Sequence, residues 1–381
     1  MFGRAARGGD RLRGLRQRDR GGQGGRPPLR GRPQPDDRRP RPGRRRPPPR
    51  LAGGRLRGRA VGAAGVKALV LGGPGFIGTA TCKELMRRGV ETIAASRTPH
   101  PYGTFTSHLA FDRTDEAELA RVLAEVEPDL LVDHAAYQPS QVEAVIRHFK
   151  GERYLFTSTG VYPDLFEDRP AREEDFKPLD GEVPAEPLEY REGKRWCETV
   201  LARSRDLPWT VIRPPAVLGA ADHTLRIAAY LQRVEDGGPL LVPAESYRRQ
   251  AGLAWVRDVG YAHALATDLA KPTVGRAYNV AFDGVSLEDL LLGIGRATGR
   301  EVRLAPVPFA ELPPDASPYG PDPRRSAGYD LSRSRRELGF EPSALEDCLA
   351  EVLAWYRAAR PSHPGYAGRA RELQLAGKPR Q

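Results

Sequence analysis

Short apolar runs alternate with amphipathic stretches from about Val66 onwards, a pattern typical of β-α-β units. The first apolar run predicts a buried strand at residues 67–71, and the amphipathic stretch after it predicts a helix that ends near Arg88, before Gly89. Further strands are predicted at residues 91–95, 109–111, 129–133, 154–157 and 209–212, with helices starting at Thr114 and spanning 142–149 and 188–203. This alternation predicts an α/β fold with a doubly wound parallel Rossmann sheet.

Beyond Pro214 the strict alternation is lost, and the chain ends in an amphipathic helix predicted at residues 345–359. We therefore expect residues 63–215 to form the Rossmann domain. Residues 216–360 are expected to form a smaller C-terminal part that is integrated with the same sheet, and residues 361–381 a tail.

Residues 1–62 consist almost entirely of Arg, Gly and Pro, a composition that buries too little apolar surface to offset chain entropy. We expect a disordered extension. It carries most of the positive charge, since residues 1–60 contain 20 Arg and 4 Asp, whereas the whole chain has 60 basic and 49 acidic side chains. Residues 61–381 therefore hold 40 basic and 45 acidic side chains, so nucleic-acid binding is expected only through the extension, if at all. The alternative is a nonfunctional extension, translated from a start assigned too far upstream.

The remaining composition excludes several classes of protein. Cys82, Cys197 and Cys348 lie far apart, which favours packed thiols in a reducing compartment over a disulfide framework. The seven His residues show no metal-ligand spacing, so no metal site is predicted. There is neither an apolar run long enough for a membrane span nor a secretory signal pattern, and we expect a cytoplasmic protein with no membrane contact.

A glycine-rich turn connects the first predicted strand to its helix. Gly72, Gly75 and Gly78 have the spacing G-x-x-G-x-x-G, with Phe76 and Ile77 between the last two. Glycines at such a turn let a pyrophosphate approach the amides at the helix N-terminus. Because strand, turn and helix stand in the required order, the sequence predicts a dinucleotide site that includes these five residues.

The end of the second strand indicates which dinucleotide is bound. A carboxylate there would accept a hydrogen bond from a ribose 2′-hydroxyl, whereas a cation would bind a 2′-phosphate. This chain has Ser96 and Arg97 at that position and no acid. NADP is therefore favoured over NAD, the alternative being that Arg97 is only a solvated loop charge.

Tyr190 and Lys194 have the spacing Y-x-x-x-K, which places both side chains on one face of the predicted helix. A nearby ammonium lowers the pKa of a phenol, which can then exchange a proton with a substrate hydroxyl or carbonyl. Ser158 follows the fifth strand, where ligands of open α/β sheets bind, and its hydroxyl can orient the same substrate oxygen. Thr159 is the alternative for that role. We predict Ser158, Tyr190 and Lys194 as catalytic residues.

Together these segments resemble the NAD-dependent epimerase/dehydratase family, the extended short-chain dehydrogenase/reductases, over about residues 66–360. Asp112 matches the acid that contacts adenine in the family, and Ala135 and Ala136 match its small residues beside the cofactor. Pro214 belongs to a segment similar to the family's R-P-x-x-x-x-G sequence near the nicotinamide. Ser158, Tyr190 and Lys194 fall on its catalytic positions. Within the family, the chain looks most like the branch of the chloroplast stem-loop-binding proteins.

The resemblance implies hydride transfer with a nucleotide sugar or a similar hydroxylated small molecule, bound mainly by residues 216–360. It is also compatible with a homodimer. A dehydratase of the family would carry an Asp-Glu pair after its catalytic Thr, and here Thr159 and Gly160 follow Ser158, so an epimerase or a reductase is favoured. His134 stands where an apolar residue is usual, and we expect it to pack rather than to catalyse. Two other classes stay open: a dinucleotide-sensing regulator without turnover, and an RNA-binding relative that uses the basic extension.

Overall fold

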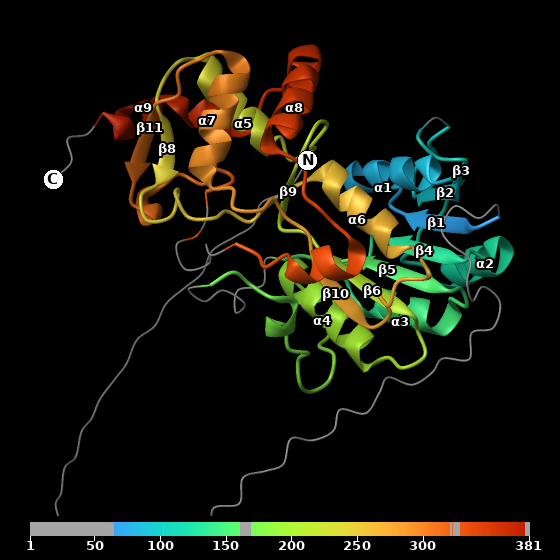
Figure 1. The fold of residues 1–381 in the computed structure, drawn as a ribbon. Helices are drawn as coiled ribbons and strands as arrows, with labels where there is room; N and C mark the ends of the chain where they lie inside the picture. The colour runs from blue at the N-terminus through green and yellow to red at the C-terminus, as the bar shows by residue number, and fades with distance from the viewer. Residues whose placement is uncertain (1–64, 102, 161–168, 321, 323–327, 378–381) are drawn as a thin grey trace, which may run out of the picture. The chain divides into compact units, whose positions relative to one another are not determined.

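Seven parallel strands form the central sheet of this computed structural model, in the order β10-β6-β5-β4-β1-β2-β3 (Figure 1). The strands are β1 (Lys67–Leu71), β2 (Glu91–Ser96), β3 (Ser107–Ala110), β4 (Leu130–Asp133), β5 (Arg153–Thr157), β6 (Trp209–Arg213) and β10 (Arg276–Asn279). The structure describes residues 65–101, 103–160, 169–320, 322 and 328–377, all of which fall in one compact unit. The predicted doubly wound Rossmann sheet is confirmed.

Helices cover both faces of this sheet. They are α1 (Phe76–Arg87), α2 (Glu116–Val126), α3 (Pro139–His148), α4 (Tyr190–Arg203) and α6 (Val256–Ala266). Alternate residues of a strand point to opposite faces, so in β1 Ala68 and Val70 pack with α1 and α6, while Leu69 and Leu71 pack with α2, α3 and α4. Because both faces are buried, the strands read as continuous apolar runs.

Some helices begin a few residues away from their predicted starts, for local reasons. The helix expected from Thr114 begins at Glu116, because the Asp115 side chain caps it by accepting hydrogen bonds from the amides of Ala117 and Glu118. The helix expected from residue 142 begins earlier, at Pro139, a residue that favours the first helical position. Strand β10 was not predicted. It comes from beyond residue 215 and pairs with β6 along Thr210–Arg213.

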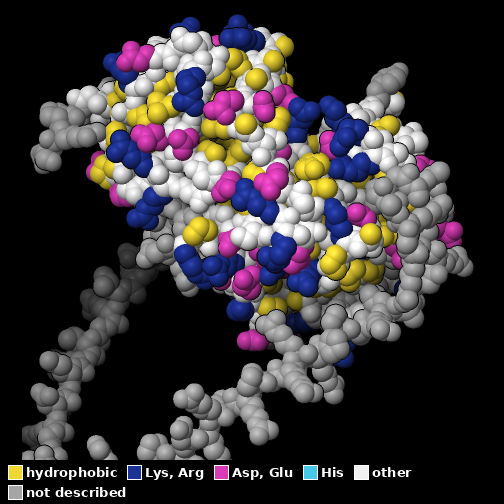
Figure 2. Space-filling view, viewed as in Figure 1, with side chains coloured by type: hydrophobic (Ala, Val, Ile, Leu, Met, Phe, Trp, Pro, Cys, Tyr) yellow, Lys and Arg dark blue, Asp and Glu magenta, His cyan; other side chains and the backbone are white. Residues whose placement is uncertain are grey.

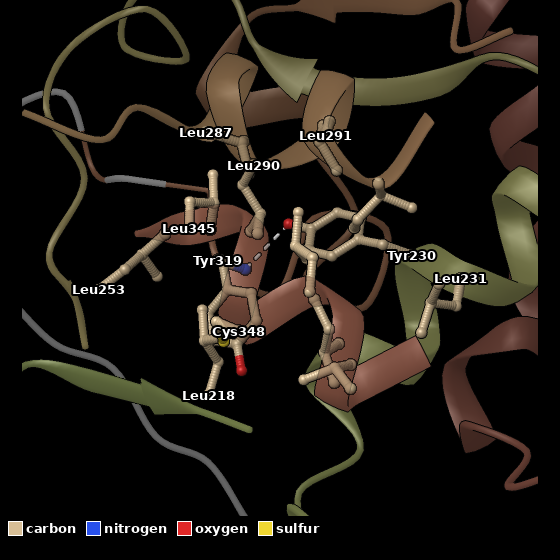
Figure 3. Packing of buried hydrophobic residues seen from close by; sticks show 14 of the residues in the cluster. Leu218, Tyr230, Leu231, Leu253, Leu287, Leu290, Leu291, Tyr319, Leu345 and Cys348 are labelled. Carbon is tan, nitrogen blue, oxygen red and sulfur yellow. Dashed lines mark hydrogen bonds between the residues drawn. The ribbon is translucent and has the colours of Figure 1, made fainter. Parts of the chain in front are cut away.

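A second group of elements surrounds its own apolar core (Figure 3). It contains α5 (Arg226–Glu235), α7 (Leu287–Thr298), α8 (Leu345–Ala359) and two parallel strand pairs, β8 (Leu240–Pro243) with β11 (Leu304–Val307) and β7 (Ala216–Leu218) with β9 (Leu253–Trp255). The described residues also include three short 3₁₀ helices, η1 (Glu173–Asp175), η2 (Phe309–Glu311) and η5 (Pro364–Gly368), and a short π-helix, η4 (Ser334–Leu338). In this core the amide of Tyr319 donates to the hydroxyl of Tyr230 at 3.0 Å, the bond drawn in Figure 3.

The segment expected to be a tail contains η5 and α9 (Arg369–Ala376). Buried ion pairs tie α9 to the C-terminal elements, since Arg233 donates to Glu372 at 2.8 Å and Arg369 donates to Asp236 at 2.6 Å. Such long-range pairs leave no periodic signal in the sequence, which is why the segment read as a tail.

On the face shown in Figure 2, basic and acidic side chains are interspersed over the described residues. The expected extension, residues 1–62, lies outside the described residues. Cys82, Cys197 and Cys348 are all buried free thiols. Within the described ranges, no helix combines the length and apolarity that a membrane crossing requires.

Candidate functional site

Three of the four residues between β1 and α1 are glycines. Gly72 has a φ of +78°, and a Cβ added to Gly78 would stand 2.1 Å from the Gly72 carbonyl oxygen. These two positions therefore require glycine. Gly75 is the N-cap of α1 and offers no side chain to the amides of the first helical turn. Those amides and the positive end of the helix dipole suit an anion such as a pyrophosphate.

A pocket of about 490 Å³ opens beside this turn, and we call it the strand-end pocket. It lies where β1, β2, β3 and β4 end, the position at which open α/β sheets bind nucleotides. Among its lining residues are six that the sequence predicted as cofactor contacts: Gly72, Gly75, Ser96, Arg97, Asp112 and Ala135. The glycine turn, the uncapped helix and this pocket together fit a dinucleotide.

The polar residues at the edge of the strand-end pocket are held by local bonds. The Ser96 hydroxyl donates to the Thr98 carbonyl at 2.8 Å and lies 2.9 Å from Nε2 of His108. Asp112 accepts hydrogen bonds from the amide and hydroxyl of Thr114, which lower the pKa of its carboxyl, with a further contribution from the Arg97 charge. Arg97 itself is exposed, with its charge available at the end of β2.

A buried ion pair, which the sequence analysis did not identify, lies behind this pocket. Asp133, at the end of β4, accepts hydrogen bonds from Arg113, from the hydroxyl of Tyr154 and from the amides of Ala135 and Ala136. Asp133 has no exposed surface and Arg113 is 8% exposed. The carboxylate therefore fixes the backbone turn that brings Ala135 to the pocket. Its only sequence signal was an acid at the end of an apolar strand.

Lys194 points into the protein. It is 2% exposed, and its ammonium donates to the carbonyl oxygens of Ala136 and Thr157, both at 2.7 Å. The rings of Tyr137 and Phe156 lie 4.5 and 4.7 Å from the same nitrogen, a cation–π arrangement. Burial lowers the pKa of Lys194 to about 8. This side chain thus joins the ends of β4 and β5 to α4.

Tyr190 lines a second cavity, of about 740 Å³, which we call the Tyr190 cavity. Its ring is 51% exposed and stands 5.9 Å from that of Tyr137. Partial burial raises the pKa of Tyr190, while a hydrogen bond with the Thr159 side chain and the charges of Arg226 and Arg191 oppose the rise. Lys194 was expected from the sequence to lower this pKa. In the structure its ammonium is directed at two backbone carbonyls.

The remaining predicted residues fall into two groups. Phe76 and Ile77, at the start of α1, line the Tyr190 cavity, whereas Gly72 and Gly75 of the preceding turn line the strand-end pocket. Ser158, Gly78, Ala136 and Pro214 are buried. Of the two hydroxyls after β5, Thr159 lines the Tyr190 cavity and bonds with Tyr190, whereas the Ser158 amide donates to the Ile212 carbonyl at 2.8 Å.

Sequence reasoning missed two basic residues of the Tyr190 cavity, Arg191 and Arg226. Arg191 stands inside the Y-x-x-x-K motif, but consecutive helical residues do not face each other, so the motif gave no reason to place its side chain in the same cavity as Tyr190. Arg226 begins α5, 36 positions after Tyr190, and no spacing rule connects the two. Among the described residues, no group of three or more His, Cys, Asp or Glu is arranged to hold a metal ion.

Residues 68–281 match the family model of the NAD dependent epimerase/dehydratase family. The chain belongs to this family. The resemblance inferred from its motifs is thereby confirmed. A curated relative, the chloroplast stem-loop binding protein of 41 kDa b of Arabidopsis thaliana, is 26% identical over 243 residues, which are 58% of this chain and 61% of that protein. The match therefore spans less than two thirds of that relative's length, and it agrees with the expected branch of the family.

Solved structures of the family share the fold of this epimerase/dehydratase family member. The UDP-glucose 4-epimerase of Thermotoga maritima has a TM-score of 0.59 at 21% identity, covering 78% of this chain and all of that one (100%). The UDP-glucuronic acid 4-epimerase of Bacillus cereus, solved with NAD, has a TM-score of 0.58 at 15% identity, covering 78% of this chain and 99% of that one. At these identities the likeness establishes the fold.

Proposed function

We propose that this protein is an NAD(P)-dependent epimerase or reductase that acts on a nucleotide sugar or a similar hydroxylated small molecule. One observation carries the proposal: Tyr190, hydrogen-bonded to Thr159, lines a cavity bordered by Phe76 and Ile77 at the start of α1, directly after the glycine turn that lines the dinucleotide-sized strand-end pocket. Family membership and the nucleotide-sugar epimerases among its structural neighbours support the same conclusion.

The reaction assigned to the site is proton transfer coupled to hydride transfer. A bound nicotinamide dinucleotide supplies the hydride acceptor and donor. Tyr190, as phenolate, would take the proton of the substrate hydroxyl, and the dinucleotide would accept the hydride from the same carbon. In an epimerisation Tyr190 would later return the proton to that oxygen. Thr159 or Ser158 orients the oxygen, the structure favouring Thr159 because it already bonds Tyr190.

Lys194 has a positioning role in this proposal. Its two bonds to the carbonyls of Ala136 and Thr157 hold the backbone on either side of the site. The cations that oppose the raised pKa of Tyr190 are Arg226 and Arg191. Formation of the phenolate therefore depends on the positive charge of these two arginines in the cavity.

We propose NADP as the cofactor. Ser96 and Arg97, which line the strand-end pocket at the end of β2 where a 2′-phosphate would lie, support this choice. We expect Gly72, Gly75, Gly78 and the start of α1 to hold the pyrophosphate. Asp112 and Ala135 would border the adenosine, and Phe76, Ile77, Ala136 and Pro214 the nicotinamide side.

A panel of UDP-, GDP- and dTDP-sugars, each with NAD and with NADP, tests the proposal. We expect one sugar to give a reduced-nicotinamide absorbance change or an epimer detectable by NMR. Tyr190→Phe should lower kcat by about 10²-fold or more while the dinucleotide still binds. The matched control is Tyr366→Phe, whose hydroxyl contacts Asp236 away from the cavity. Dinucleotide binding without turnover of any sugar would instead identify a sensing protein, and no dinucleotide affinity would refute the proposal.

A second candidate, stem-loop nucleic-acid binding, is favoured by the name of the Arabidopsis thaliana relative. In that case the full chain should bind a stem-loop RNA with an affinity that falls steeply as salt rises, and a chain that begins at Gly65 should lose it if the Arg-rich extension is responsible. Binding of equal strength by the shortened chain would place the nucleic-acid site on the folded part.

A further inference from the structure

Two guanidinium groups share the Tyr190 cavity without an acidic partner. Arg191 follows Tyr190 on α4 and Arg226 begins α5, and both line the cavity. Within the described ranges neither forms an ion pair with a carboxylate, whereas the buried Arg213 pairs with Glu198 and the buried Arg233 with Glu372. Two positive charges beside a reacting phenol create a potential that favours an anion.

Arg226 is held by a rigid platform. Its guanidinium lies over the ring of Tyr319 at 6.0 Å, and that ring stacks on Tyr230 with centroids 6.0 Å apart. Figure 3 shows Tyr319 and Tyr230 among the leucines of the C-terminal core, joined by the bond from the Tyr319 amide to the Tyr230 hydroxyl. Tyr319 is 5% exposed. The platform reduces the freedom that Arg226 loses when it binds a ligand.

Asp222, an acid that also lines the cavity, is hydrogen-bonded to other donors. It accepts hydrogen bonds from the amide and hydroxyl of Thr224 at 2.9 and 2.7 Å, and the Tyr319 hydroxyl lies 3.5 Å from its other oxygen. Asp322 lines the cavity as well.

We propose that Arg191 and Arg226 bind a carboxylate attached next to the substrate carbon that reacts at Tyr190, so that the preferred substrate is a nucleotide-linked sugar acid rather than its neutral sugar. This inference rests on the function proposed above. In a nucleotide sugar the diphosphate is attached to the anomeric carbon, across the ring from carbon 4, whereas the carboxylate of a hexuronate is attached to the carbon adjacent to carbon 4. Because Arg191 and Arg226 lie beside Tyr190, their position matches that of the carboxylate rather than that of the diphosphate. A guanidinium binds a carboxylate through paired donors.

Calorimetric titration of the full chain, loaded with its dinucleotide, with UDP-glucuronate and with UDP-glucose tests the inference. These ligands share the nucleotide and the diphosphate and differ only at the carboxylate. We expect UDP-glucuronate to bind about tenfold more tightly than UDP-glucose. This is the difference in affinity that one additional charge-assisted hydrogen bond would produce. Arg226→Gln and Arg191→Gln should each abolish most of this difference and leave the affinity for UDP-glucose unchanged. Arg226→Lys should restore part of it.

The control variant is Arg121→Gln, on the exposed surface of α2, where Arg121 pairs only with Glu125. Equal weakening of both ligands by Arg226→Gln would show that the arginines bind the shared diphosphate and would overturn the inference. Equal affinity of the unmodified protein for both ligands would also overturn it. If neutral sugars are turned over with NAD(P) while the acid gains no preference, the proposed function stands and only this inference fails. If the dinucleotide binds but no sugar in the wider panel binds or reacts, the proposed function fails too.

Discussion

The imidazole rings of His134 and His263 stand 4.8 Å apart, edge to face, and share the hydroxyl of Thr157. His263 Nδ1 lies 2.8 Å from the Val259 carbonyl oxygen, which only accepts, so this nitrogen carries the proton. Burial disfavours the charged form of both rings. With both rings neutral, Nε2 of His263 accepts from the Thr157 hydroxyl, whose oxygen accepts from Nδ1 of His134. The Thr157 carbonyl also accepts a hydrogen bond from the Lys194 ammonium, so the two histidines support the backbone that holds the lysine.

Stability should consequently fall as the pH is lowered below about 6.5. Burial lowers the pKa of His263 to about 4, and burial together with the charges of His263 and Lys194 lowers that of His134. In the unfolded chain both rings take up protons near pH 6.5, so between pH 6.5 and about 4 the unfolded state binds more protons and gains stability. For His263 alone the loss approaches about 3 kcal/mol.

Urea unfolding at a series of pH values measures this loss. His263→Phe should flatten the pH dependence of the unfolding free energy over this window, even if it lowers stability at pH 7. Arg121→Gln, on the exposed surface of α2, should leave the slope as it is. An unchanged slope in His263→Phe would show that the imidazole is not kept neutral by the fold.

Gly78→Ala should remove dinucleotide binding. The new methyl group would stand 2.1 Å from the Gly72 carbonyl oxygen, so the turn must move away from the geometry that presents its amides. Overpacking of this kind also costs about 1–3 kcal/mol of stability. Fluorescence titration with NAD and NADP measures the affinity. In the control Gly368→Ala the methyl group meets nothing within 4 Å, and wild-type affinity in Gly78→Ala would contradict the assigned turn.

Arg97→Asp should reverse the cofactor preference. We expect the affinity for NADP to fall by about tenfold or more, because a 2′-phosphate would lose a charged partner and meet a carboxylate. NAD affinity should stay the same or rise, since an acid at this position can accept a bond from the 2′-hydroxyl. Direct binding of both dinucleotides gives the ratio, with Arg121→Asp as the control. An unchanged ratio of the NADP affinity to the NAD affinity would show that Arg97 does not contact the cofactor.

Arg213→Met should be among the most destabilising single substitutions outside the pocket. Arg213 and Glu198 are each 3% exposed, with Nε of Arg213 3.0 Å from both carboxylate oxygens, so the change leaves a buried charge unpaired. The expected loss is about 3–5 kcal/mol in the free energy of urea unfolding. The double variant Arg213→Met, Glu198→Leu should recover much of it. Arg121→Met, which breaks an exposed pair, should cost less than about 1 kcal/mol.

Local patterns were sufficient for the Rossmann half of the chain. The apolar run of β1, the glycine spacing from Gly72 to Gly78 and the spacing of Tyr190 and Lys194 each express a constraint within one strand, turn or helix. Such constraints repeat with the geometry of the element, which is why these elements were predicted to within a few residues. The predicted cofactor residues at the ends of β1 to β4 meet in one pocket because parallel strands end at one edge of the sheet.

The sequence by itself determined the fold class, the glycine turn and the helix on which the phenol and the ammonium stand. Only the tertiary structure decided that β10 completes the sheet, that Lys194 faces two carbonyls, that Thr159 is the hydroxyl bonded to Tyr190, and that Arg226 joins Arg191 in the cavity. The physical reason is that these contacts join segments far apart along the chain. Packing and charge in the folded protein determine which residues form these contacts. Contacts of this kind do not recur at a regular spacing, so they produce no periodic pattern in the sequence.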